Sequence, residues 1–117
     1  MDGEGRMAMS RKARTVKAGL VAFHYPSRDY SEEMLGRVRR AAEFIASRPG
    51  CLGVDCWFTE DGEAIVSTGQ WESQEALLGG FAAARAAGID FRVDEREVRP
   101  REIFRLTGTN GAADRRR

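Results

Sequence analysis

The order in which two apolar periodicities alternate constrains this chain more than any other feature. Period-two alternation, typical of strands, occurs in four segments, and helical spacing in two, near residues 31–48 and 73–88. This order, strand, helix, strand, strand, helix, strand, is that of the split βαβ unit. The sequence therefore predicts an α+β, ferredoxin-like domain (βαββαβ) with an antiparallel sheet. The strand-like segments are VKAGLVAFHY, CLGVDCWF, GEAIVSTGQW and REIFRL.

Local signals mark the ends of these elements. Arg48-Pro49-Gly50 ends the first helix, because proline disfavours helical geometry in the residue before it. Thr59-Glu60-Asp61-Gly62 supplies turn residues, so the two middle strands should form a hairpin. Ser73 suits the N-cap of the second helix, which is predicted to end at Gly88. Residues 89–100 show no decisive pattern.

The early strands are apolar on both sides. Leu20 and Ala22 alternate with Val21 and Phe23, and the second strand repeats this around Trp57. Two helices can cover only one face of the sheet, and large exposed apolar patches are rare on monomers. We therefore expect two copies to pair through the uncovered faces and form a homodimeric α/β barrel.

Composition narrows the classes of partner. The 117 residues suit one domain, predicted over residues 16–107, with disordered tails over 1–15 and 108–117. Nineteen Lys and Arg balance eighteen Asp and Glu, with the signs interspersed, so nucleic acid is not an expected partner. The basic runs MSRKAR and DRRR fall in the tails and are interpreted as solvated ends. No apolar run is long enough to span a membrane.

The number and spacing of the cysteines and histidines indicate whether a metal site is possible and which redox compartment suits the chain. Cys51 and Cys56 are five residues apart, which on a regular strand places them on opposite faces, about 16 Å apart and beyond disulfide reach. They are interpreted as reduced thiols of a cytoplasmic protein. With one histidine, the chain offers no metal-ligand set, and no glycine-rich phosphate loop opens a helix. We expect no bound cofactor.

Two motifs carry a resemblance to a known family. They are Arg48-Pro49-Gly50-Cys51-Leu52 before the second strand and Gln70-Trp71-Glu72-Ser73-Gln74-Glu75-Ala76 between the third strand and the second helix. Over about residues 18–107 the chain resembles the antibiotic biosynthesis monooxygenases, which are dimeric α/β-barrel proteins. It is most similar to the cofactor-independent members that oxidise phenolic polyketides to quinones. The resemblance implies a pocket between sheet and helices for a planar aromatic that itself activates dioxygen.

The resemblance also assigns site positions. The third-strand tryptophan of those oxygenases matches Trp71; Ser67 stands in the place of their asparagine, and Leu77 in that of their tyrosine. Haem-degrading members carry a tryptophan and a histidine on the second helix. The matching stretch LLGGFAAARAAG has neither, so haem breakdown is not expected.

The residues themselves suggest a catalytic group of Trp71, Ser67 and His24. Trp71 and Ser67 share a strand face with Gly69 between them, which leaves room for a flat ring. The indole N–H can donate to a developing oxyanion, and the neutral imidazole of His24 can accept a phenol proton. For each residue a purely structural role is the alternative: a core tryptophan, a polar strand residue, a hydrogen-bonded histidine.

Further candidates would bind the substrate. Leu77, Phe81 and Arg85 lie on the second helix, where the guanidinium of Arg85 could clamp an anionic substituent or simply be solvated. Asp55 and Trp57 share one face of the second strand, with Asp55 as a second candidate base. Whether that face lines the pocket or the subunit interface stays open. The 26–30 loop is the expected mouth of the pocket.

Two functions follow from these residues. The first is a cofactor-independent monooxygenase acting on a phenolic aromatic with dioxygen. The second is a non-catalytic dimeric module that binds a small molecule in the same fold. The sequence leaves open whether the chain is an enzyme.

Overall fold

The computed structural model describes residues 16–109, which form one four-stranded antiparallel sheet and two α-helices. The strand order is β2-β3-β1-β4, with every neighbouring pair antiparallel. This confirms the predicted α+β, ferredoxin-like split βαβ arrangement. The elements are β1 (Ala18–His24), a 3-10 turn η1 (Arg28–Tyr30), α2 (Ser31–Ala46), β2 (Cys51–Phe58), β3 (Ile65–Trp71), α3 (Gln74–Ala86) and β4 (Glu102–Thr107).

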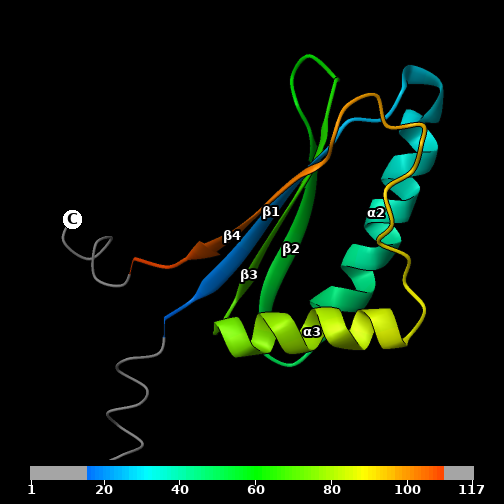
Figure 1. The fold of residues 1–117 in the computed structure, drawn as a ribbon. Helices are drawn as coiled ribbons and strands as arrows, with labels where there is room; N and C mark the ends of the chain where they lie inside the picture. Colours follow the sequence, from blue (N-terminus) through cyan, green and yellow to red (C-terminus); the bar gives the residue numbers. More distant parts are fainter. Residues whose placement is uncertain (1–15, 110–117) are drawn as a thin grey trace, which may run out of the picture.

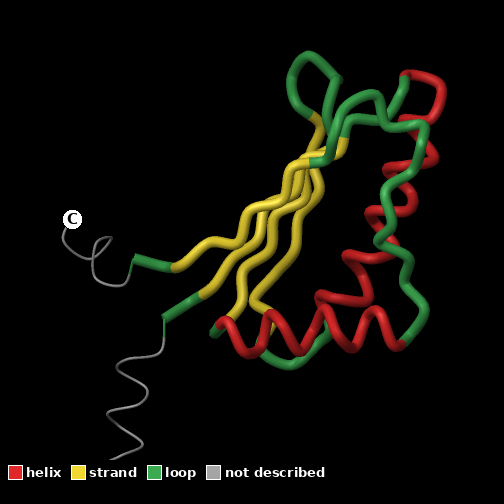
Figure 2. Tube along the Cα trace, in the orientation of Figure 1, coloured by secondary structure: helices red, strands yellow, loops and turns green. Residues whose placement is uncertain are grey.

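Both helices lie on the same side of the sheet (Figure 1). Helix α2 packs mainly on the edge strand β2, while α3 crosses beneath one end of the sheet. The segment 87–101 returns the chain from α3 to β4 on the helical side as well (Figure 2). The opposite face of the sheet carries no helix of the described part of the chain. One face is thus covered and the other bare.

The predicted boundaries hold at two places. The hairpin between β2 and β3 closes with a Thr59 N to Ala64 O hydrogen bond of 3.0 Å, and Gly62 in its loop has φ +77°. The Ser73 hydroxyl caps α3 by accepting from the Ala76 N–H at 3.1 Å. Helix α2 begins at Ser31 after a 3-10 turn, and no side chain caps its first N–H groups.

The facing of Cys51 and Cys56 differs from the prediction. Cys51 pairs with Trp71 and Cys56 with Ser67, so both cysteines lie on the covered face. The cause is a β-bulge between Cys51 and Gly53, which adds one residue and reverses the alternation. Both thiols are free.

The buried core has two parts, one at each end of β3. Trp71 anchors the first, and Ile65 anchors the second. Smaller residues occupy the covered face between them. The first cluster contains Ala18, Ile45, Trp71, Leu77 and Ala84; the second contains Tyr30, Met34, Leu35 and Ile65.

Hydrogen bonds attach the segment after α3 to the end of β1. Ser27 N donates to Arg96 O at 2.8 Å, and Val98 N donates to Tyr25 O at 2.7 Å. Residues 89–100, whose sequence pattern was ambiguous, form no strand here apart from an isolated bridge between Pro26 and Glu97. The segment is therefore an ordered connection on the helical side.

The predicted tails, with their basic runs, lie outside the described residues over 1–15 and 110–117. Gly108, which was assigned to the second tail, donates its N–H to Lys17 O at 2.7 Å beside the sheet. Neither helix within residues 16–109 is long and apolar enough to cross a membrane.

Candidate functional site

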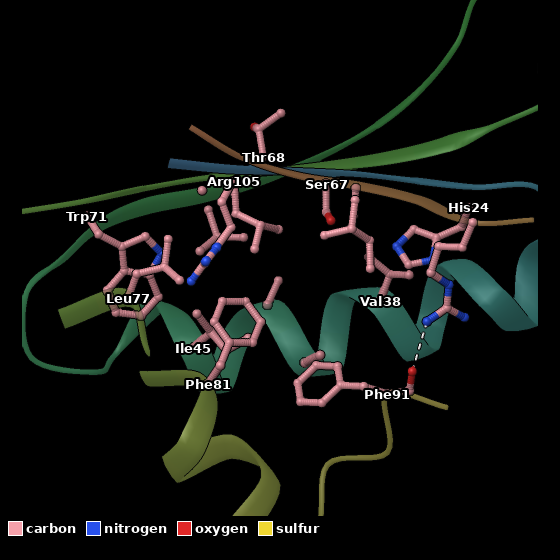
Figure 3. Close-up of a pocket in the computed structure, with 18 of the residues that line it drawn as sticks. His24, Val38, Ile45, Ser67, Thr68, Trp71, Leu77, Phe81, Phe91 and Arg105 are labelled. Carbon is pink, nitrogen blue, oxygen red and sulfur yellow. Dashed lines mark hydrogen bonds between the residues drawn. The ribbon is translucent and has the colours of Figure 1, made fainter. Parts of the chain in front are cut away.

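A cavity of about 570 Å³ lies between the covered face of the sheet and the two helices (Figure 3). Its volume falls within the range of small-molecule sites, and its wall is mostly apolar. Side chains from all four strands, both helices and the 87–101 segment contribute to it. The residues on which the argument rests are Leu20, His24, Ser67, Gly69, Trp71, Leu77, Phe81, Arg85, Phe91, Arg101 and Arg105.

The cavity exists because the middle of the sheet floor carries small side chains. Strand pairing aligns Ala22 with Ser67, and Leu20 with Gly69. Ala22 has only a methyl group, Ser67 only a hydroxymethyl, and Gly69 no side chain. The bulky side chains of β3 on this face, Ile65 and Trp71, stand at its two ends, so the space over its middle is left open.

Trp71 is both a core residue and a cavity wall. Its side chain is 1% exposed and packs in the first core cluster. A Cβ on Gly80 would lie only 2.2 Å from the indole Cη2, so α3 can approach the ring only with glycine at this position. The two neighbouring glycines of α3 therefore differ in their surroundings, because a Cβ on Gly79 would meet nothing within 4 Å. Close packing on Trp71 explains one glycine and not the other.

The indole N–H of Trp71 points over the gap in the floor. Its Nε1 lies 3.5 Å from the position that a Cβ on Gly69 would take. Among the hydrogen bonds within residues 16–109, none involves this N–H, whereas the N–H of Trp57 donates to Thr68 Oγ1 at 3.3 Å. A ligand lying over Gly69 would therefore meet a hydrogen-bond donor.

His24 closes the far end of the floor. The residue is 9% exposed, and its buried Nδ1 has no hydrogen-bond partner among the described residues. Burial, reinforced by the positive charges of Arg101 and Arg37, lowers the pKa of His24 to about 4, while Glu97 opposes this shift. The imidazole is therefore neutral at pH 7, and one of its nitrogens is an acceptor.

A buried ion pair stands beside His24. The Arg101 guanidinium binds the Glu97 carboxylate through both Nε and Nη2, and their side chains are only 8% and 1% exposed. Arg101 also donates to Phe91 O at 2.9 Å, as the dashed line in Figure 3 shows. Sequence reasoning missed this pair, because residues 89–101 lack periodicity. The four-residue spacing of opposite charges, Glu97 and Arg101, was the available signal.

The helical wall contains the predicted binding residues. Leu77 is 1% exposed, and Phe81 and Arg85 also line the cavity. The Phe81 ring packs between Trp71, at 6.2 Å between centroids, and Phe91, at 5.6 Å. The aromatic surface thus continues from the floor across α3 to the following segment.

Two predicted binding residues lie elsewhere. Asp55 pairs with Thr68, and Trp57 pairs with Val66, so both face the bare side of the sheet. Both are exposed, Trp57 by 57%, and neither lines the cavity. The prediction that Asp55 and Trp57 bind the substrate in the pocket wall of this chain is therefore corrected, because both lie on the opposite face of the sheet. Alternation in β2 shows which residues share a face but not which face the helices cover.

The expected mouth also differs. Residues 26–30 contribute nothing to the cavity wall. Ser27 N donates to Arg96 O and Val98 N donates to Tyr25 O, so the start of this loop lies against the 87–101 segment. The less covered border is β4, where Ile103 lines the cavity yet is 56% exposed. Within residues 16–109, no three His, Cys, Asp or Glu side chains gather closely enough to hold a metal ion.

The two sequence motifs meet in space beside this cavity. Gly50 O accepts a hydrogen bond from Glu72 N at 2.8 Å, and a Cβ on Gly50 would approach Ala76 Cβ to 2.6 Å. The family model described as antibiotic biosynthesis monooxygenase matches residues 18–82, more than half of the chain. The chain belongs to this family.

Solved structures share the monooxygenase family fold. Rv0793 of Mycobacterium tuberculosis is 20% identical, with 82% of this chain and 98% of that chain covered and a TM-score of 0.66. PA3566 of Pseudomonas aeruginosa is 19% identical, with 79% and 93% covered and a TM-score of 0.62. A structure described as antibiotic biosynthesis monooxygenase is 14% identical, with 76% and 95% covered and a TM-score of 0.65. None of the curated proteins matches the chain.

Proposed function

We propose that this family member binds a small phenolic aromatic in its cavity and oxidises it with dioxygen, without metal or flavin. The observation that carries the proposal is the convergence of Trp71, Ser67 and His24 on one cavity of about 570 Å³. A planar ring fits over Gly69, where the floor has no side chain. The aromatic surfaces of Trp71 and Phe81 would flank it.

The proposed chemistry draws its electrons from the substrate. The phenol loses its proton, and a ring carbon para to the phenolate oxygen, which still carries a hydrogen, then forms a bond to dioxygen. The peroxide takes up a proton, and the resulting hydroperoxide loses water to leave a second carbonyl, so the phenol and O₂ become a quinone and H₂O. Neutral His24 accepts the phenol proton, Trp71 donates to the developing oxyanion, and Ser67 orients an oxygen substituent.

The bare face supports the homodimer as part of this proposal. Trp57, Phe104 and Leu106 lie on it and are 57, 50 and 48% exposed. Apolar groups gathered on one sheet face typically mark an association surface. A second copy, related by a two-fold axis, would cover this face while leaving both cavities on the outer, helical sides. The free cysteines support our further proposal of a cytoplasmic location.

A non-catalytic binding module is the second candidate, and two observations favour it. Leu77 places a buried aliphatic group where the quinone-forming oxygenases that the chain resembles carry a tyrosine. A pKa of about 4 also makes His24 a weak base toward a phenol. In this reading, the cavity holds the aromatic without turning it over.

Oxygen uptake by the purified protein with a panel of hydroxylated polycyclic phenols tests the choice. A Gly69→Ala variant sharpens it, because the new methyl would sit at ordinary contact distances, 3.5 Å from Trp71 Nε1 and 3.8 Å from Val54 Cγ2. It should fold, mask the N–H and lower turnover roughly ten- to a hundredfold. Gly79→Ala, whose methyl meets open space, is the matched control. Phenols that bind without consuming oxygen would leave the binding module as the function.

A further inference from the structure

The cavity wall carries an excess of positive charge. Its only acidic member among the described residues, Asp90, is already paired with Arg92 at 2.9 Å. A ligand filling the cavity would therefore meet guanidinium groups and no free carboxylate. The charged residues of the wall are Arg37, Arg85, Asp90, Arg101 and Arg105.

Two of these arginines are committed to protein partners. Arg37 donates to Tyr30 Oη and lies 3.3 Å from the Asp94 carboxylate. Arg101 is bound by the buried Glu97 carboxylate. Their charges are compensated without a ligand.

Arg105 differs, since none of the hydrogen bonds or ion pairs within residues 16–109 involves it. It pairs across the sheet with Leu20, and Leu20 pairs with Gly69, over which the Trp71 N–H lies. Figure 3 shows its guanidinium directed into the cavity on the Trp71 side, while His24 stands at the opposite end. Two hydrogen-bond donors thus face the same end of the cavity.

Arg105 is exposed at the β4 border of the cavity, so its guanidinium is in contact with solvent. A neutral ring packed against it would remove part of this water and supply no anion in return. Such desolvation is costly unless an anion compensates it. A carboxylate suits best, because its two oxygens match the planar fork of arginine. The His24 end of the cavity suits a different group, a neutral hydrogen-bond donor such as a hydroxyl, because the imidazole nitrogen is an acceptor.

We propose that the ligand is a hydroxyaryl carboxylate, with its carboxylate held by Arg105 beside the Trp71 N–H and its hydroxyl facing His24. Leu20 and His24 mark the two ends on β1 and are four residues apart, roughly 13 Å along a strand. This span suits about two or three fused rings. The inference rests on the cavity of the proposed function and specifies its substrate class.

Calorimetric titration with a matched ligand pair tests it. The probes are 6-hydroxy-2-naphthoic acid and 2-naphthol, which share the ring and hydroxyl and differ in the carboxylate. Wild type should bind the acid at least tenfold more tightly. Arg105→Gln should weaken the acid at least tenfold and leave 2-naphthol within twofold, while Arg105→Lys keeps part of the preference. Arg85→Gln is the control, because Arg85 is the other cavity arginine whose side chain has no hydrogen bond or ion pair within residues 16–109, and it should have the smaller effect.

The inference is overturned if wild type binds both probes equally, if it binds neither, or if Arg105→Gln weakens both alike. Its failure is distinguishable from that of the proposed oxidation. If the acid binds as expected and no phenol consumes oxygen, the oxidation fails and the ligand class stands. If phenols are oxidised and Arg105→Gln changes nothing, the ligand class fails alone.

Discussion

The two tryptophans of this chain show how differently the two faces of one sheet are used. Trp71, on the covered face, is 1% exposed, whereas Trp57, on the bare face, is 57% exposed. Along β3, the covered face has small residues in the middle and bulky ones at the ends, which leaves a cavity. The bare face has bulky apolar residues that nothing within residues 16–109 covers. An alternating strand pattern thus lines a cavity on one side of the sheet and leaves an apolar surface exposed on the other.

The largest effect is expected where the covered face is packed most tightly. Gly80→Ala places a methyl 2.2 Å from the Trp71 ring, so the indole or α3 must move. Overpacking of this kind lowers the free energy of unfolding by about 3 kcal/mol. Urea unfolding measures it. Gly79→Ala, in open space, should instead gain up to about 1 kcal/mol from helix propensity. Equal effects of the two variants would contradict the packing role of Gly80.

The bare face is tested by a charge on its surface. Phe104→Glu should weaken the dimer at least a hundredfold, about 2.7 kcal/mol, because a carboxylate would be buried without a partner. Sedimentation at micromolar concentration should show about twice the 13.0 kDa chain mass for wild type and the single mass for the variant. Val93→Glu is the control, an exposed apolar residue outside the sheet. If wild type sediments as a monomer, the bare face is not an association surface.

A smaller effect on the free energy of unfolding is expected from the protonation of His24, which lies on the covered face. The pKa of His24 is lowered to about 4 in the fold, from an ordinary value near 6.5. The unfolded chain therefore binds the extra proton first, so stability is full above about pH 6.5 and falls as the pH drops toward 4. Between pH 7 and 4.5 the loss should be about 2 kcal/mol. Thermal unfolding of wild type and His24→Gln across this range isolates the contribution, and parallel profiles would contradict it.

Much of the fold could be predicted from sequence because its determinants are local. Period-two and helical spacing gave the order of elements, Ser73 marked a helix start, and the Asp61-Gly62 turn marked the hairpin. Alternation also placed Trp71, Ser67 and Gly69 on one face, which the pairing of β3 bears out. These features depend on residues a few positions apart, so the sequence by itself determined them.

Tertiary structure decided the rest. The bulge at Cys51 reverses the alternation of β2, and only the pairing with β3 reveals that Asp55 and Trp57 face the bare side. Glu97 and Arg101 reach the neighbourhood of His24 through backbone bonds between residues more than sixty positions apart, such as Val98 N to Tyr25 O. Arg105 faces the cavity because β4 pairs with β1, a long-range contact without a local signal. Burial and charge compensation depend on such contacts, so the cavity, its neutral histidine and an arginine without a charged partner among residues 16–109 emerge only in the folded chain.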